Sequence, residues 1–313
     1  MLSILVYALA AVVVLVAVRW LLVRRLQAPP TLEPFDGTVY RVGEATVLER
    51  TSSDASVTVV CMHGYLENFG YFMPFYSSPE VQLILISSAG YHTPGPAISP
   101  GWARPVAGVA GTIEYDAAVL VQALENLPRT GRVRVHGHSR GGAVVLEASG
   151  QRPDLFERAE VVLEAPVLPG GKPRTQISAA AMWILPFLIP LWRMQPISKR
   201  NQALWGRLDN ADKRRAISAL PFNPRRIHTM LVNLRSIKEW SERDDVKRLS
   251  AARGVVIVPG DDQVLDPVSM AASAERGRPR LQIVNAPASS HFVLYDEPQL
   301  LALNEQRAGA SDA

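Results

Sequence analysis

The chain has 313 residues, of which 48% are hydrophobic and 20% charged, so it can bury a large core. Its formal net charge is +4, but residues 1–30 hold three arginines and no acid, which leaves only +1 for the rest. This balance excludes the basic surface typical of a nucleic-acid-binding protein. The single cysteine, Cys61, excludes an intramolecular disulfide framework and a thiolate-based zinc site.

Residues 1–26 are predicted to form a membrane-spanning helix. Leu2–Val18 contains no charge, and three arginines and a tryptophan follow it before residue 26. A spanning helix needs roughly 20 apolar residues, and arginines flanking it mark the cytoplasmic side. A cleaved signal peptide, the alternative, would carry its basic residues before the apolar stretch. We therefore expect a single-pass anchor, a linker at residues 27–37 and a cytoplasmic C-terminal domain.

Strands and helices are predicted to alternate along most of the remaining chain. Unbroken apolar runs suit parallel strands that are buried on both faces, so the pattern favours an α/β fold with a mostly parallel, doubly wound sheet. Its first part is expected at residues 38–166 and its second at 251–313. The predicted strands are 38–42, 45–50, 56–62, 81–87, 132–136, 159–163, 255–259 and 281–285, and the predicted helices are 111–127, 142–148, 268–276 and 297–306.

The segment Gly137-His138-Ser139-Arg140-Gly141 lies where a predicted strand turns into a predicted helix. In this arrangement the serine occupies a strained backbone conformation with its hydroxyl above the sheet, and glycines two residues before and after it avoid collisions. Ser139 is therefore the candidate nucleophile.

Residues 167–250 interrupt the alternation with about eighty residues that contain no clear strand. An insertion of this kind predicts a helical cap over the strand ends. Within it, Ile177–Gln195 is strongly apolar, and Trp183, Phe187 and Trp192 are candidates for substrate binding. The alternative is a second transmembrane helix, but Pro186 and Pro190 interrupt the stretch and basic residues flank it. We expect a cap that lines an acyl pocket or dips into the membrane surface; a cap with no ligand role is the simpler alternative.

A serine nucleophile needs a base and a third group that orients the base. His291 lies in a small-residue loop after the last predicted strand, whereas His228, the other histidine after Ser139, lies in the presumed cap. The acid should follow the strand at 255–259, where three aspartates occur. Asp262 has the best reach toward His291, Asp261 is expected beside the strand end, and Asp266 before a proline reads as a helix N-cap.

Acyl transfer also needs N–H donors where negative charge develops on the carbonyl oxygen. The backbone N–H groups of Arg140, at the start of the helix, and of Tyr65, after the strand at 56–62, are the candidates. His63 is expected to fix the turn that carries Tyr65, and His136 and His138, which flank the elbow, to serve in packing or in support of the turn. No phosphate loop, dinucleotide motif or metal-ligand spacing occurs in the sequence, so we expect no cofactor and no metal.

Four segments together resemble the α/β-hydrolase superfamily between about Val57 and Pro298. They are His63-Gly64-Tyr65, Gly137-His138-Ser139-Arg140-Gly141-Gly142, Gly260-Asp261-Asp262 and Ser290-His291-Phe292. The elbow and the cap are similar to those of serine esterases, lysophospholipases and monoacylglycerol-lipase-like members, and the elbow serine disfavours members with an aspartate nucleophile. One departure is Gln263, which stands where a family acid often lies.

The resemblance implies a serine hydrolase that acts on carboxylic esters through an acyl-enzyme, with Ser139, His291 and Asp262 as its triad. The anchor and the apolar cap suggest a lipid-like ester. The alternatives are acyl transfer, hydrolysis of an amide or a carbon–carbon bond on the same triad, or a catalytically silent binding or scaffold protein. Substrate identity, chain length and oligomeric state do not follow from the sequence.

Overall fold

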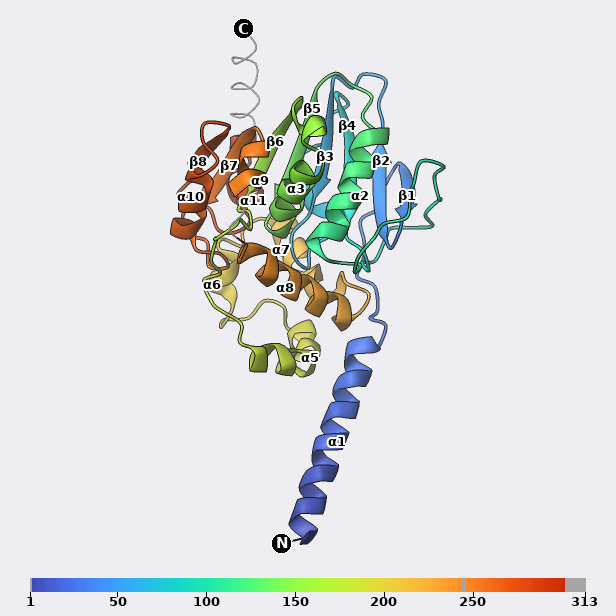
Figure 1. Cartoon of the computed structure of the whole chain (residues 1–313), viewed down its shortest axis with the longest axis vertical. Helices are drawn as coiled ribbons and strands as arrows, with labels where there is room; N and C mark the ends of the chain where they lie inside the picture. Colours follow the sequence, from blue (N-terminus) through green and yellow to red (C-terminus); the bar gives the residue numbers. More distant parts are fainter. Residues whose placement is uncertain (1, 244–245, 302–313) are drawn as a thin grey trace.

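The computed structural model describes residues 2–243 and 246–301 and is built around one eight-stranded sheet (Figure 1). The strand order is β1-β2-β4-β3-β5-β6-β7-β8. Strands β1 and β2 pair antiparallel with each other and β2 pairs antiparallel with β4, whereas all pairs from β4 to β8 are parallel. The strands are β1 Thr38–Val42, β2 Ala45–Arg50, β3 Val57–Met62, β4 Val81–Ser87, β5 Val133–His138, β6 Ala159–Glu164, β7 Gly254–Pro259 and β8 Leu281–Ala286. The predicted α/β fold with a mostly parallel sheet is confirmed.

Helices lie on both faces of the sheet and beyond one of its ends (Figure 1). They are α1 Leu2–Arg24, α2 Ile113–Asn126, α3 Arg140–Gln151, α4 Pro153–Phe156, α5 Ala179–Met194, α6 Gln202–Trp205, α7 Ala211–Ala219, α8 Ile227–Ser241, α9 Val246–Ala251, α10 Pro267–Glu275 and α11 Val293–Asp296, with short 3-10 turns η1 Phe69–Phe72 and η2 Leu220–Phe222. Of the helix predicted at residues 297–306, only 299–301 are described and helical; residues 302–306 lie outside the described residues.

Burial on both faces explains the unbroken apolar strands. In β3, Val60 and Met62 belong to the core cluster that contains α2 and α3, whereas Val59 and Cys61 belong to the cluster on the opposite face. Successive side chains of a strand point to opposite faces, so a strand covered on both sides needs apolar residues throughout. Cys61 is buried, and burial raises the pKa of its thiol well above the usual value, as expected of an inert core cysteine.

Helices α5–α9 lie between β6 and β7, and the described residues from 165 to 253 form no strand. Figure 1 shows α5–α8 below the sheet, between the strand ends and α1, whereas α9 lies beside the sheet against α3. Helix α5 runs without a break through Pro186 and Pro190, so the expectation that these prolines interrupt the segment was wrong. The two prolines are four residues apart, so the N–H that Pro190 lacks is the one that would have reached the Pro186 carbonyl. At 16 residues, α5 remains shorter than the roughly 20 residues of a membrane span.

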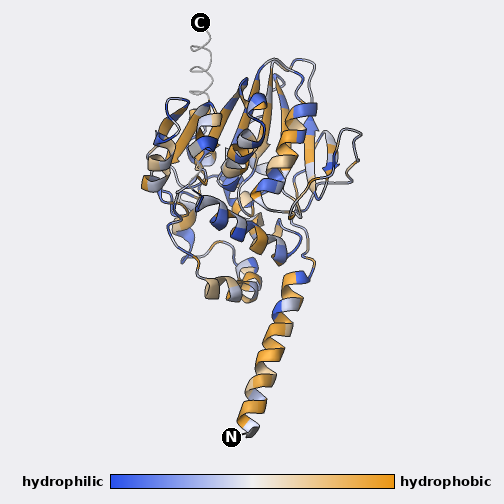
Figure 2. Ribbon diagram, viewed as in Figure 1, coloured by the Kyte–Doolittle hydropathy of each residue, from blue (hydrophilic) through white to orange (hydrophobic). Residues whose placement is uncertain are grey.

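Helix α1 extends away from the rest of the chain and is apolar along its length, as Figure 2 shows. Ser3–Arg24 is long and apolar enough to cross a membrane, a property that N-terminal signal sequences share. The residues just after α1 are bonded to the cap. Gln27 donates its backbone N–H to the Arg225 carbonyl at 2.9 Å and its side-chain amide to the Pro224 carbonyl at 3.0 Å.

Candidate active site

The turn between β5 and α3 holds Ser139 in a conformation that few residues adopt. Its φ is 51° and its ψ is −117°, a left-handed region that favours glycine. A Cβ at Gly141 would lie 2.0 Å from the Met62 backbone oxygen, and one at Gly137 would lie 2.6 Å from the Gly141 oxygen. Both flanking glycines are therefore required by close backbone approach, and the elbow predicted from the sequence is present.

A buried ion pair between Arg140 and Asp116 holds the elbow in place. The Arg140 guanidinium lies 2.8 Å from the Asp116 carboxylate of α2 and also donates to the Gly111 carbonyl and the Ser88 hydroxyl. Arg140 and Asp116 are both completely buried. An unpaired charge in such a position would be costly, so the pair fixes the residue after Ser139 and its backbone N–H. From the sequence, only the backbone N–H of Arg140 was assigned a role; the buried ion pair of its side chain was not predicted.

Asp262 and His291 are brought together at the ends of β7 and β8. The Asp262 carboxylate lies 2.8 Å from His291 Nδ1. Its other oxygen accepts the backbone N–H groups of Val264 at 2.7 Å and Leu265 at 2.9 Å. Burial opposes the charge on Asp262, but the His291 imidazole and these N–H donors hold the pKa of the carboxyl below its usual value. Asp262 therefore stays ionised and can orient the imidazole.

The other two aspartates are turned to different tasks. The Asp261 carboxylate accepts a hydrogen bond from the side chain of Gln263 at the exposed surface. Asp266 caps α10, where its carboxylate accepts the Ser269 N–H at 3.0 Å. Of the three candidates left open by the sequence, only Asp262 contacts His291 in the described structure. Gln263, at the position where a family acid often lies, takes no part in this contact.

Ser139 and His291 lie at the same end of the sheet and are nearly buried, with 6% and 4% of their surface exposed. No hydrogen bond joins the Ser139 hydroxyl to the His291 imidazole in the described residues. Catalytic hydrogen bonds are often long in ligand-free enzymes and tighten when substrate binds. His228, in contrast, is exposed on the cap helix α8.

The loop after β3 carries Tyr65 to the elbow. His63 Nδ1–H donates to the Gly64 carbonyl at 2.8 Å, and its Nε2 accepts the Ser88 N–H at 3.1 Å. Burial lowers the pKa of His63 to about 4, so the ring is neutral and fixes the turn, as predicted. Leu66 has a φ of 65°, and its N–H is held by the Tyr91 hydroxyl. The Arg140 N–H, at the first position of α3, has no partner within the helix and is available to a ligand oxygen.

His138, the residue before Ser139, holds the backbone of the candidate base. Its Nε2–H donates to the His291 carbonyl at 2.8 Å, and its Nδ1 lies 2.8 Å from the Glu67 carboxylate. The ring stacks on Tyr71 with centroids 4.5 Å apart. Burial opposes a charge on His138, but the carboxylates of Glu67 and Glu164 raise its pKa to about 9. The sequence predicted a packing or turn-supporting role for His138, whereas Glu67 was not identified.

Glu67 also links this histidine to the loop that carries Tyr65. Its carboxylate accepts the Gly64 N–H at 2.6 Å. One buried carboxylate therefore touches both the candidate oxyanion loop and, through His138, the backbone of His291. His136 stays within its predicted supporting role: it is buried and lies 2.7 Å from the Tyr76 hydroxyl.

The cap contacts the loop that presents His291. Lys213 of α7 is completely buried and lies 2.6 Å from the Asp296 carboxylate and 3.1 Å from the Ser290 hydroxyl. Trp205 packs against Phe292, with ring centroids 6.0 Å apart. Residues on both sides of His291 are thus tied to the cap.

The three cap candidates for substrate binding face different surroundings. Trp192 is partly buried against the core cluster that includes Ile189. Trp183 is 38% exposed, pairs with Phe187 at a centroid distance of 5.8 Å and lies under the Arg19 guanidinium of α1. Trp183 is therefore directed toward α1 in the structure, and no contact joins it to Ser139 or His291 in the described residues.

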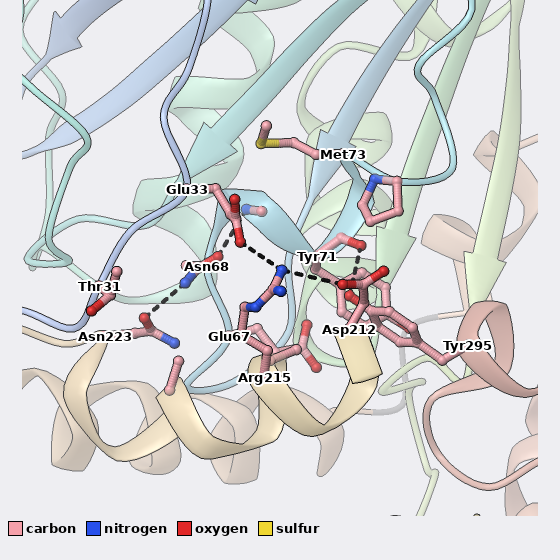
Figure 3. A pocket seen from close by; sticks show the side chains of 14 residues that line it. Thr31, Glu33, Glu67, Asn68, Tyr71, Met73, Asp212, Arg215, Asn223 and Tyr295 are labelled. Atoms are coloured by element: carbon pink, nitrogen blue, oxygen red, sulfur yellow. Dashed lines mark hydrogen bonds and ion pairs between the residues drawn. The ribbon is translucent and has the colours of Figure 1, made fainter. Parts of the chain in front are cut away.

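A cavity of about 280 Å³, lined by both polar and apolar side chains, lies beside the loop that carries Glu67 (Figure 3). Glu67 and Tyr71 line one side of it, and Arg215 of α7 crosses it with ion pairs to Glu33 at 2.9 Å and Asp212 at 3.2 Å. Neither Ser139 nor His291 lines this cavity. It is therefore separate from the space in which Ser139 would meet a substrate.

Comparison with known proteins identifies the family. No curated protein sequence is significantly similar to this chain. The sequence model of the alpha/beta hydrolase family matches residues 59–303, well over half of the chain. The chain belongs to the α/β-hydrolase family. The resemblance seen in the four sequence segments is thereby confirmed, and the sheet order and the cap after β6 are those of an α/β-hydrolase fold.

Solved structures of other α/β-hydrolases share this fold at low identity. An esterase from Exiguobacterium antarcticum matches with a TM-score of 0.62 and 15% identity over 89% of this chain and 100% of that chain. A thermophilic esterase from Thermogutta terrifontis matches with a TM-score of 0.59 and 19% identity over 92% and 98%. An N-formylmaleamic acid deformylase from Pseudomonas putida S16 matches with a TM-score of 0.56 and 14% identity over 83% and 95%. At these identities the neighbours show that the fold is shared, and the family match shows the family.

Proposed function

We propose that the protein is a membrane-anchored serine hydrolase that cleaves carboxylic esters, with Ser139, His291 and Asp262 as its triad. The observation that carries this proposal is the 2.8 Å contact between Asp262 and His291 Nδ1 at the sheet end where the strained Ser139 elbow lies. Asp262 and His291 are in contact and Ser139 lies at the same end of the sheet, and the three follow the chain order Ser, Asp, His of an α/β-hydrolase. The strained backbone at Ser139, in a region that favours glycine, is what a nucleophile elbow requires.

The reaction follows from the roles of these groups. The Ser139 hydroxyl attacks the ester carbonyl carbon while His291 Nε2 takes its proton, and Asp262 stabilises the resulting imidazolium. The oxyanion accepts the N–H groups of Tyr65 and Arg140. His291 then gives the proton to the leaving alcohol, and an acyl-serine remains. Water, activated by the same imidazole, attacks the acyl carbonyl and releases the acid and free Ser139.

The lipid character of the substrate rests on the N-terminal helix and the cap. An apolar helix of membrane-spanning length supports an uncleaved anchor, and the arginines at its end favour a cytoplasmic catalytic domain. The exposed apolar side chains of α5 support a cap that lies against lipid while the site below it binds the ester. An ester carried in or near the bilayer suits both features.

A fluorophosphonate probe tests the nucleophile. We expect the probe to label the wild-type chain and to lose its target in Ser139→Ala, because phosphonylation requires an activated serine hydroxyl. Ser250→Ala is the matched control, since Ser250 is an exposed serine on α9 whose loss should leave labelling unchanged. Absence of labelling in the wild type, or equal labelling of Ser139→Ala, would leave only a silent binding or scaffold protein of the same fold.

An ester panel from acetyl to long-chain glycerides, run with and without an acceptor alcohol and beside matched amides, tests the reaction class. We expect free acid as the product, with longer acyl chains preferred. Transfer of the acyl group to the alcohol, or faster amide cleavage, would replace ester hydrolysis as the function. For the anchor, we expect the intact N-terminus in the membrane fraction after alkaline extraction; a mature chain that starts beyond residue 26 would identify a signal peptide.

A further inference from the structure

Helix α5 presents an apolar face to the outside of the molecule. Its residues Ile184, Leu188 and Leu191 are 46%, 49% and 64% exposed and recur at the helical spacing of four and three residues. Met194 and Trp183 flank this stripe and are also exposed. The opposite side of α5 buries Ile189 and Pro186 against the protein. The helix is thus apolar on its outer as well as its inner side.

Contacts with α1 determine the depth of this face along the axis of the proposed anchor. The Arg19 side chain donates to the Trp183 carbonyl at 2.9 Å, and its guanidinium lies 5.6 Å from the Trp183 ring centroid. Leu2–Val18, which precedes Arg19, would be about 26 Å long as a helix, close to the roughly 30 Å hydrocarbon core of a bilayer. Arg19 therefore falls at the interface if α1 spans the membrane, and Trp183 falls at the same depth.

Hydrogen bonds after α1 keep the cap at this level. The Arg226 side chain donates to the Arg24 carbonyl at 3.2 Å, and the Gln27 N–H donates to the Arg225 carbonyl. The end of α1 is thus joined to α8 as well as to α5. Figure 1 shows the cap between α1 and the sheet, so the cap is the part of the catalytic domain nearest to the anchor.

Charge divides the chain between this side and the rest. Residues 1–32 carry three arginines and no acid, and residues 165–208, which include α5, carry six basic residues and no acid. These two segments hold a charge of +9, so the remaining chain holds −5 of the total of +4. Lys199 and Arg200, just after α5, are exposed. An apolar stripe with basic neighbours and no acids matches a membrane surface with anionic headgroups.

We propose that the outer face of α5, with Lys199 and Arg200 beside it, docks onto an anionic lipid bilayer next to α1. This inference rests on the proposed anchoring by α1 and goes beyond it. The anchor alone would leave the catalytic domain free to tilt, whereas a second contact through the cap holds the cap against the bilayer. The site under the cap then receives its ester from the membrane side.

Lipid-borne quenchers test this arrangement in the full chain. The variants Leu191→Cys on α5, Val14→Cys on α1 and Val268→Cys on α10 are each labelled with an environment-sensitive fluorophore; Cys61 is buried and does not compete. Val268 is the matched control, because it is a 77% exposed apolar residue outside the cap. The labelled proteins are reconstituted into vesicles of phosphatidylcholine, with or without phosphatidylglycerol, that contain nitroxide-labelled lipid.

We expect the label at position 191 to be quenched roughly threefold more strongly than the label at 268, since an interfacial helix inserts about 5–10 Å. Phosphatidylglycerol should strengthen this quenching, and Lys199→Gln with Arg200→Gln should remove that gain. Equal quenching at 191 and 268, with strong quenching at 14, would overturn the docking and leave the anchor intact. Weak quenching at 14 would overturn the anchor and the docking with it. A result independent of phosphatidylglycerol would overturn the anionic preference.

Discussion

Replacing Ser139 by glycine should stabilise the protein while it abolishes activity. Ser139 is held at φ 51° and ψ −117°, where a side chain is strained. Such a conformation costs on the order of 1–3 kcal/mol and persists only because surrounding structure enforces it. The restraints are visible: the Ser139 N–H donates to the Glu164 carbonyl, and its own carbonyl accepts the N–H groups of Gly142 and Val167.

The expected gain is the relieved strain minus the flexibility that glycine adds to the unfolded chain. That flexibility costs about 0.5–1 kcal/mol. Little else is lost, because the Ser139 hydroxyl makes no hydrogen bond to His291 in the described structure. The net change in the free energy of unfolding is therefore about 0–2.5 kcal/mol in favour of Ser139→Gly, with a central value of about 1 kcal/mol. For a chain of this size, each kcal/mol raises the melting temperature by about 2–4 °C.

Ser139→Ala is the control that isolates the backbone from the hydroxyl. It removes the same nucleophile but keeps a Cβ, so its strain remains. Urea unfolding of both full-length variants in detergent micelles measures the difference, and hydrolysis of a soluble ester checks that both are inactive. If Ser139→Gly unfolds at the same or a lower urea concentration than Ser139→Ala, the elbow is not strained and this reasoning is wrong.

Three further predictions concern the surroundings of the elbow. Gly141→Ala should prevent stable folding, because its Cβ would lie 2.0 Å from a backbone oxygen of β3. Gly150→Ala in the same helix is the control, because its Cβ would meet only a flexible side chain. It should lower the free energy of unfolding, measured in urea, by less than about 1 kcal/mol. His138→Gln should lower kcat roughly 10- to 100-fold with little change in KM, because the His291 backbone loses its hydrogen bond to His138. His228→Gln is the control, since His228 is exposed and the variant should keep wild-type kinetics. Equal kcat values in the two variants would disprove the positioning role of His138. Stability should be greatest near pH 6.5. The pKa of His63 is lowered to about 4 in the folded protein, so its contribution to the free energy of unfolding is lost as pH falls from 6.5 to 4. The pKa of His138 is raised to about 9, so its contribution to the free energy of unfolding is lost as pH rises from 6.5 to 9. Urea unfolding across this range should show a fall of about 1–3 kcal/mol on each side, and a flat profile would contradict the assignment.

The fold and the main chemical groups could be predicted because each leaves a local pattern. Every strand was predicted to within one or two residues, since strands buried on both faces are continuously apolar and are bounded by turns. Ser139 and His291 were identified from their places after a strand. The choice among three aspartates stayed open, because reach toward His291 depends on how the loop after β7 folds. The Asp262 side chain folds that loop itself by accepting two of its N–H groups.

The groups that support the site leave no local pattern. Glu67 and His138 are 71 residues apart in the sequence, and Asp116 and Arg140 are 24 apart. Each member alone reads as an ordinary loop or helix residue. Only the pairing explains why a carboxylate and a cation are both buried, and the pairing is set by which strands and helices become neighbours.

Helix α5 shows why hydrophobicity alone did not orient the cap. When a helix is apolar on one side only, the sequence predicts which side is buried, but α5 is apolar on both sides. The sequence therefore favoured Trp183, Phe187 and Trp192 equally as substrate-binding residues. In the structure, Trp192 packs inward, whereas Trp183 contacts Arg19 of α1. The outer face of α5 is therefore apolar next to an apolar N-terminal helix, and this pairing is the observation from which we propose that a lipid surface covers both.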